Sequence, residues 1–443
     1  MERETLSKFG VLLLILSSLG CAVYFSRPLP PSGKTVIRFL TYETGQGQMD
    51  MVNAIKRDFE KANPDIEVQV EFNSMARDKI YVETASGTEP DAFYAVTDDI
   101  PRLAIKGAIE PLNELIARDK ASNLNIYFPE VVNALRYAPP YLKIPRAKQE
   151  LYAYPIHFST DILFYNKDLF EKAGVPFPTD KWTWAQMIEA ARKLTVKDDR
   201  GRITQFGMFL PDTATTIEGN GGHVFNSDYT RCLIASPQAL EAVETLRALR
   251  FKDHIAPTPA QVQETSSMQM FKLGQIAMLP GRTYMTVDFN KITDFKYDAT
   301  LMPGMKFNVE RLAVGGVCIS RHSDAQHKAA AYRWAKFYCS PEGGQAILGC
   351  EKNCVTAVKA LALSPKYFLK PPPANSRVLV DSLYDSRITI PPIVGASEYI
   401  NGIATPSTDD MLRTEHMDIA AALRNYQAAT NKLLAKEPKG PTR

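Results

Sequence analysis

The chain has 443 residues, more than one hydrophobic core usually serves, and this length predicts two domains or lobes. Hydrophobic residues make up 45% of the chain and charged residues 23%, which is the balance of an ordinary globular protein. The 52 basic and 49 acidic residues leave a formal net charge of only +3, which argues against nucleic acid as the main partner.

The N-terminus has the pattern of an export signal. Arg3 and Lys8 precede an uncharged, mostly apolar stretch that ends in the small residues before Cys21. We therefore interpret residues 1–25 as a signal, lipoprotein or membrane-anchor segment, with Cys21 as the lipidation site if the segment is cleaved there. Lipoprotein, uncleaved anchor and soluble secretion all remain open, and each of them exports the rest of the chain. The proline-rich residues 26–34 would form a stiff tether that holds the body near the membrane, at the cell surface or in the periplasm.

Six cysteines are present, and Cys350 and Cys354 are the only close pair. An exported location permits a disulfide between them, and free thiols are the alternative. No cluster of ligands has the spacing of a metal site, so we expect neither a metal nor a cofactor.

The first elements alternate between strand and helix patterns. Residues 35–41 are apolar and β-branched, residues 50–62 carry apolar side chains at helical spacing, and residues 66–72 alternate as in a half-buried strand. This order predicts a βαβ unit and a partly parallel sheet.

The α/β pattern continues to the C-terminus. A strand is expected at 92–96, followed by helices at 100–106 and from 108 to 115, a strand at 163–165 and a helix at 168–173. Thr183 is a plausible N-cap for a helix at 184–194, and further helices are expected at 237–251, 323–339 and 409–435. No clean linker separates two consecutive domains, which favours lobes that share the chain through several crossings.

Several segments resemble, in their order and spacing, the family 1 extracellular solute-binding proteins of the maltodextrin-binding type. They include R-D-F-E-K-A-N-P-D-I-E-V, A-S-G-T-E-P-D-A-F, F-Y-N-K-D-L-F-E-K-A-G, F-K-L-G-Q-I-A-M and G-G-V-C-I-S. The resemblance covers nearly all of the chain after the N-terminal segment.

The resemblance implies a clamshell of two α/β lobes, each a mostly parallel sheet flanked by helices, joined by hinge crossings. It places residues 35–154 and 304–344 in lobe 1 and residues 155–303 and 345–443 in lobe 2. Crossings are expected near Tyr154-Pro155, Thr300-Pro303 and Pro341-Leu348. The implied role is the binding component of an ABC importer, a monomer that passes a sugar-like solute to membrane permease subunits. The chain has no P-loop motif, so ATP hydrolysis would belong to a partner.

Ligand residues are expected at strand ends that face the cleft, where α/β folds hold their ligands. By this rule and by the resemblance, the candidates are Tyr42, Glu43, Thr44, Asp98, Ser159, Thr160, Asp161, Gly222, His223, Gly281, Arg282, Tyr284, Gly316, Arg387 and Tyr399. Thr283 stands where the family often carries a tryptophan as a stacking platform. Tyr284 is the expected replacement, unless the pocket is smaller and more polar.

The class of ligand stays open at this stage. A neutral sugar is the first expectation, and an anionic solute is the alternative because Arg282 and Arg387 would offer forked donors. Two other functions compete with import. One is a ligand sensor for a membrane receptor, and the other is a glycan-acting enzyme that uses Glu43, Asp98 and Asp161 as paired carboxylates. We expect a binding protein rather than an enzyme.

Overall fold

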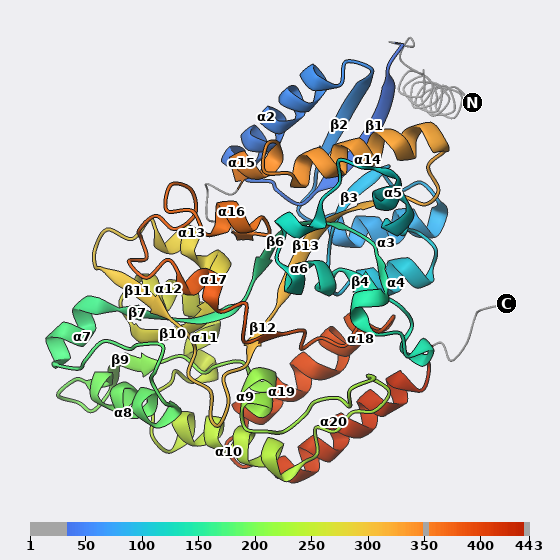
Figure 1. Cartoon of the computed structure of the whole chain (residues 1–443). Helices are drawn as coiled ribbons and strands as arrows, with labels where there is room; N and C mark the ends of the chain where they lie inside the picture. Colours follow the sequence, from blue (N-terminus) through green and yellow to red (C-terminus); the bar gives the residue numbers. More distant parts are fainter. Residues whose placement is uncertain (1–32, 349–353, 438–443) are drawn as a thin grey trace, which may run out of the picture.

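The computed structural model describes residues 33–348 and 354–437, and its first elements form the expected βαβ unit (Figure 1). Strands β1 (Thr35–Thr41) and β2 (Ile66–Phe72) pair in parallel, with Thr35 opposite Ile66. Helix α2 (Gln46–Ala62) lies between them in sequence and buries Val52, Ile55 and Phe59 completely. The alternating and helical apolar patterns therefore form the elements that they predict.

The first lobe is built on a six-stranded sheet with the order β14-β6-β13-β3-β1-β2. The strands not yet named are β3 (Ala92–Val96), β6 (Tyr154–Ser159), β13 (Ala313–Ile319) and β14 (Val355–Thr356). Only β1–β2 and β1–β3 are parallel pairs, while β13 is antiparallel to both β3 and β6. The sheet is therefore mixed rather than mostly parallel, because β13 enters it from the second lobe in the opposite direction.

One long helix covers the centre of this sheet. Helix α14 (Ala325–Cys339) packs its Trp334 and Tyr338 rings on Phe39 of β1, with ring centroids 5.3 and 5.2 Å away. All three side chains are fully buried, and burial of large aromatic side chains is a dominant stabilising contribution. The other elements of the first lobe are α3 (Ala76–Ser86), α4 (Ile100–Ile105), α5 (Asn113–Arg118), α6 (Pro129–Ala134), β4 (Arg136–Tyr137), β5 (Glu150–Leu151), α15 (Gly344–Leu348) and α16 (Lys359–Ala362).

The second lobe is built on a five-stranded sheet with the order β11-β7-β10-β9-β8. Its strands are β7 (Asp161–Asn166), β8 (Val196–Lys197), β9 (Ile203–Met208), β10 (Ile276–Arg282) and β11 (Tyr297–Thr300), and only β9 and β10 are parallel. Helices α7 (Lys167–Ala173) and α8 (Trp184–Leu194) pack on it. The predicted cap is confirmed, because the Thr183 hydroxyl accepts the N–H of Gln186 at 3.3 Å.

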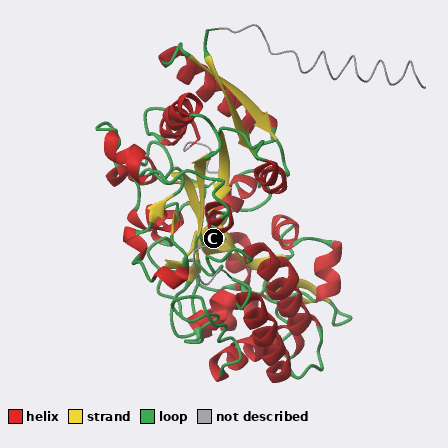
Figure 2. Cartoon of the chain, turned by 90° about the vertical axis from the view of Figure 1, so that its right-hand side faces the viewer, coloured by secondary structure: helices red, strands yellow, loops and turns green. Residues whose placement is uncertain are grey.

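A further group of helices completes the second lobe, and part of this group lies in the helix-rich lower part of Figure 2. Its members are α9 (Thr213–Gly219), α10 (Pro237–Phe251), α11 (Pro259–Glu264), α12 (Ser267–Lys272), α13 (Thr286–Phe289), α18 (Ala396–Tyr399), α19 (Thr405–Arg413) and α20 (Ile419–Leu434). The single helix expected at 409–435 is in fact two, α19 and α20. The break occurs because Asp418 caps a new helix by accepting the N–H of Ala421 at 2.9 Å.

The chain passes between the two sheets at places that differ in part from those expected. Strand β6 continues to Ser159 before β7 begins, so this passage falls at Thr160. A second passage runs from β11 through β12 (Glu310–Arg311) to β13, and β15 (Ser386–Arg387) pairs in parallel with β12. Residues 344–348 form α15 against α2 and α14, and β14 then joins the first sheet. The last passage therefore follows residue 356, whereas we expected it at 341–348; α17 (Val378–Asp381) lies on this passage.

Some expectations fall on residues that the structure does not describe. The signal or anchor segment 1–25, most of the tether, Cys21 and Cys350 lie outside the described residues. Cys354 is described, and its thiol is free. Within residues 33–348 and 354–437, none of the helices has the length and apolar character needed to cross a membrane.

Candidate functional site

The passage from β6 to β7 brings Asp161 beside the end of β10. Asp161 and Arg282 are register partners on the antiparallel strands β7 and β10, and Nε of Arg282 lies 3.7 Å from Oδ1 of Asp161. The backbone N–H of Arg311, on β12, donates to Oδ2 of the same carboxylate at 3.3 Å. Burial raises the pKa of Asp161 to about 6; the charge of Asp212 adds to the rise, and Arg282 and Arg311 oppose it.

Asp98 is a carboxyl group of the first lobe that lies within the influence of Arg311 and Arg282. It follows β3, and burial raises its pKa, while the positive charges of Arg311, Arg77 and Arg282 act in the opposite direction. The neighbouring Asp99 is already bonded, because it accepts from Nε of Arg77 at 2.6 Å and from the Tyr81 hydroxyl at 2.5 Å. Asp98 therefore lies close enough to Arg311 and Arg282 for their charges to act on its pKa, but it does not line the groove described next.

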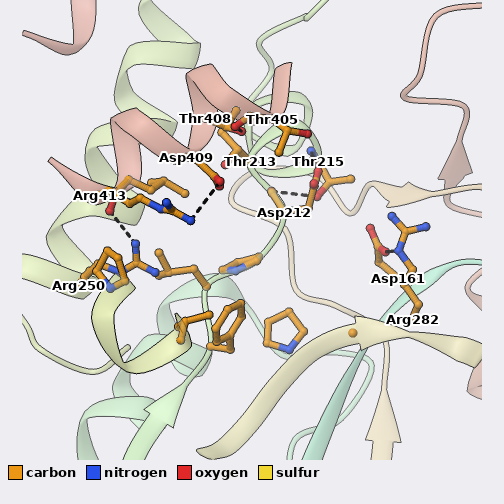
Figure 3. A pocket seen from close by; sticks show the side chains of 18 of the residues that line it. Asp161, Asp212, Thr213, Thr215, Arg250, Arg282, Thr405, Thr408, Asp409 and Arg413 are labelled. Atoms are coloured by element: carbon orange, nitrogen blue, oxygen red, sulfur yellow. Dashed lines mark hydrogen bonds and ion pairs between the residues drawn. The ribbon is translucent and has the colours of Figure 1, made fainter. Parts of the chain in front are cut away.

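A groove of about 520 Å³ starts at the Asp161–Arg282 pair and runs into the second lobe (Figure 3). Its apolar lining consists of Phe209, Leu210, Pro211, Pro259, Val262, Pro280, Met285, Met302 and Leu412. Hydroxyl and amide groups line it as well, from Thr213, Thr215, Gln263, Thr405 and Thr408. Figure 3 shows Arg250 and Arg413 at the end opposite Asp161 and Arg282. An apolar lining with Phe209 as the single aromatic ring among the described residues, together with hydrogen-bond donors and acceptors, suits a small polyhydroxylated solute, and the volume is that of a small-molecule site.

The chain matches the family model of the bacterial extracellular solute-binding proteins over residues 45–345. The chain belongs to this family. Proteins of this family bind solutes and are not enzymes. A mannitol-binding protein of Pseudomonas aeruginosa is 27% identical over 194 residues, which are 43% of this chain and 39% of that protein. A binding protein of Brucella abortus (strain 2308) is 24% identical over 269 residues, so the match spans 59% of each of the two chains.

A solved structure extends the likeness to the whole described fold. The ABC substrate-binding protein Lmo0181 from Listeria monocytogenes, in complex with cycloalternan, superposes with a TM-score of 0.79 at 27% sequence identity. The superposition covers 91% of this chain and 99% of that one. The two-lobed α/β architecture predicted from the sequence is therefore confirmed.

Ser159 and Thr160, the other ligand candidates at the first crossing, form hydrogen bonds within the protein that hold the crossing in place. Thr160 is fully buried and its hydroxyl lies 2.6 Å from that of Ser382. The Thr283 hydroxyl donates to the Ser159 hydroxyl at 3.2 Å, and its N–H donates to the carbonyl of Thr160 at 3.0 Å. Thr283, at the position of the expected tryptophan, thus ties β10 to the crossing. Its neighbour Tyr284, 39% exposed, does not line the groove in its place.

Tyr42 and Glu43 follow β1 as expected but turn into the first lobe. Together with His157 and Cys354 they line a separate cavity of about 30 Å³. The Tyr42 hydroxyl lies 3.4 Å from Nε2 of His157, and its ring packs on Tyr94. Glu43 is 5% exposed, and burial raises its pKa to about 7. Neither side chain lines the groove, and Thr44, directly after them, is exposed.

His223 and Arg387 line a different hollow, of about 630 Å³, beside β15. Both side chains are exposed, and Nδ1 of His223 lies 3.0 Å from Oε2 of Glu218. Gly222 has no room for a ligand, because a Cβ atom there would lie 2.9 Å from Cγ2 of Ile217. These three candidates are therefore not brought to the groove.

The last three candidates have packing roles, and one of them also lines the groove. Gly281 lines it, and a Cβ there would lie 2.9 Å from Sδ of Met285. Gly316 lets β13 approach β6, since its Cβ would lie 2.7 Å from the carbonyl oxygen of Tyr154. Tyr399 is 4% exposed, and its hydroxyl lies 2.8 Å from that of Tyr426.

The sequence analysis missed Arg311, Asp212 and the arginines at the far end of the groove. Asp212 had a usable signal, because it follows strand β9 and caps helix α9 by accepting the N–H of Thr215 at 2.9 Å. Arg311 lies on a strand of two residues, which leaves no periodic pattern in the sequence. Arg250 and Arg413 lie in the last turns of two helices, where basic residues are common because they complement the helix dipole.

Proposed function

We propose that this protein is the binding component of an ABC importer and that it captures a sugar or related polyhydroxylated solute in the groove that starts at Asp161 and Arg282. The family membership supports solute binding, and the mannitol-binding relative and the cycloalternan complex support a carbohydrate or polyol as the class of ligand. Delivery to permease subunits follows from the role of such proteins in ABC transport.

The observation that carries the proposal is the pairing of charges at the mouth of the groove. Arg282 is matched by Asp161, while Asp98 lies within the influence of Arg311. Matched charges leave little net attraction for an ion, yet they offer donors and acceptors to hydroxyl groups. We therefore assign the mouth of the groove to the hydroxyl-bearing part of the solute, bound by Asp161 and Arg282.

The position of the mouth supports a closing movement as part of capture. Asp161 and Arg282 belong to strands of the second lobe, whereas Asp98 belongs to the first lobe and does not line the groove, although the charges of Arg311 and Arg282 act on it. A solute that bonds to Asp98 as well as to Asp161 and Arg282 would favour the arrangement in which the lobes are close, and such differential binding is what drives closure.

The test is a calorimetric titration of the protein with mannitol, maltotriose and cycloalternan, followed by the same titrations with Arg282→Ala. We expect at least one of the three to bind, and we expect Arg282→Ala to weaken that binding more than tenfold, because it removes charge-assisted hydrogen bonds. Arg387→Ala is the matched control, since it removes an exposed arginine that does not line the groove. Equal losses in both variants would contradict the assignment of the mouth.

A further inference from the structure

The far end of the groove differs from its mouth in the balance of charge. Arg250, at the end of α10, and Arg413, at the end of α19, both line it, and Asp409 is the carboxylate that accompanies them. Nη2 of Arg413 lies 3.3 Å from Oδ2 of Asp409. Two guanidinium groups thus share one carboxylate, which leaves this end with a net positive charge.

Arg250 is buried without the partners that a buried guanidinium needs. It is 7% exposed, and Nη1 donates to the carbonyl of Leu412 at 2.6 Å. Its buried Nε has no hydrogen-bond partner within the described residues. Burial lowers the pKa of Arg250 to about 10, and the charge of Arg413 acts in the same direction. A buried, incompletely bonded cation is costly and is normally satisfied by an anion.

Arg247, one turn earlier on α10, shows that a buried arginine beside α19 can form several hydrogen bonds through its guanidinium. The unbonded Nε of Arg250 is therefore not a general result of packing against α19. Arg247 is equally buried, at 6% exposed, but its guanidinium donates to the carbonyls of Met411, Thr414 and Glu415. Arg247 thus bonds three carbonyls at and beyond the end of α19, whereas Arg250 bonds only that of Leu412. Arg250 therefore has an unbonded Nε, lines the groove, and lies near enough to Arg413 for the two charges to act on each other.

From this contrast we infer that the far end of the groove is an anion subsite, formed by Arg250 and Arg413, that binds a carboxylate or phosphate group on the solute. The guanidinium fork suits the paired oxygens of either group. The inference rests on the proposed function and narrows its class of ligand to an acidic carbohydrate. The hydroxyl groups of this solute would bind at Asp161 and Arg282, and its acidic group would bind at Arg250 and Arg413 at the other end of the groove.

The first probe of the subsite is inorganic phosphate, so the result does not depend on knowing the sugar. The thermal unfolding midpoint of the protein is measured against phosphate concentration at pH 7, with sodium chloride matched for ionic strength. We expect a saturable rise in the midpoint with phosphate only. Glucuronate is titrated in parallel, and the tighter of the two anions shows whether the subsite prefers phosphate or carboxylate.

Two substitutions with opposite predictions separate binding from fold stability. Arg413→Gln removes a half-exposed guanidinium without touching the bond from Arg250 to Leu412, and it should weaken phosphate binding at least tenfold. Asp409→Asn removes the competing carboxylate and should tighten phosphate binding about threefold or more. Arg424→Gln, on the exposed face of α20, is the control and should leave phosphate binding unchanged.

The outcomes are distinguishable from those of the sugar titrations. An identical phosphate response in the wild type, Arg413→Gln and Asp409→Asn would overturn the subsite, even if neutral sugars bind. A phosphate response with the expected order of variants supports the subsite even if none of the three test sugars binds, in which case the proposed neutral ligands fail but the anion subsite stands.

Discussion

Replacing Asp161 with asparagine should stabilise the free protein and weaken its binding to the solute. The carboxylate is 15% exposed, and its pKa rises from an ordinary 3.8 to about 6 because of burial. A folded state that holds a proton more tightly than the unfolded state loses stability as the pH rises through this interval. The loss is nearly complete about one pH unit above this pKa, and an uncharged asparagine avoids it.

The size of the effect follows from the two pKa values. The interval between 3.8 and about 6 corresponds to a free energy of about 3 kcal/mol, which is an upper limit because Arg282 loses its partner in the variant. We expect Asp161→Asn to raise the free energy of unfolding by 1–3 kcal/mol at pH 7.5, by order of magnitude, and to have little effect near pH 4. Solute affinity should fall about tenfold at pH 7.5.

The assay is urea unfolding of the wild type and the variant, each at pH 4 and pH 7.5 and without solute. The variant-minus-wild-type difference is the quantity that matters, since other titrating groups contribute equally to both proteins. If this difference is the same at the two pH values, Asp161 is not an ionised and desolvated carboxylate, and our account of the mouth of the groove is wrong.

Three further predictions concern other parts of the chain. Glu43→Gln should raise the free energy of unfolding at pH 8 but not at pH 4, because burial raises the pKa of Glu43 to about 7; urea titrations at both pH values measure this. Gly207→Ala should cost at least about 3 kcal/mol, since its Cβ would lie 1.8 Å from a backbone oxygen of α8, whereas Gly47→Ala, with open space around it, should be nearly neutral in the same assay. Arg387→Ala should leave solute affinity within about twofold of the wild type in calorimetry, because Arg387 does not line the groove.

The local elements could be predicted from the sequence because their signals are local. The strand at 35–41 and the helix at 184–194 with its Thr183 cap need only a pattern of apolar side chains and one hydroxyl. The division of the helix expected at 409–435 was missed, since a cap such as Asp418 is an ordinary helical residue until its bond to the backbone is seen.

The site could be predicted only in part, because a strand end fixes the edge of the sheet at which a residue lies but not the face to which it turns. Asp161 begins one strand and Glu43 follows another at the expected edge, yet Asp161 lines the groove and Glu43 lines the separate, much smaller cavity in the first lobe. Arg250 became a candidate only when burial and hydrogen bonds could be compared with those of Arg247. Such pairings depend on residues more than 160 positions apart.

The position of β13 has a consequence for how the chain folds during synthesis. This strand lies between β6 and β3, so the first sheet stays in two pieces until residues 313–319 have left the ribosome. The pairing of β13 with β3 closes a loop of more than 200 residues, and contacts of such long range form slowly. The first lobe also contains α14, β14 and α16, which follow β13, so it is completed only when about 80% of the chain exists. Until β13 is made, β3 lacks its neighbour on that side.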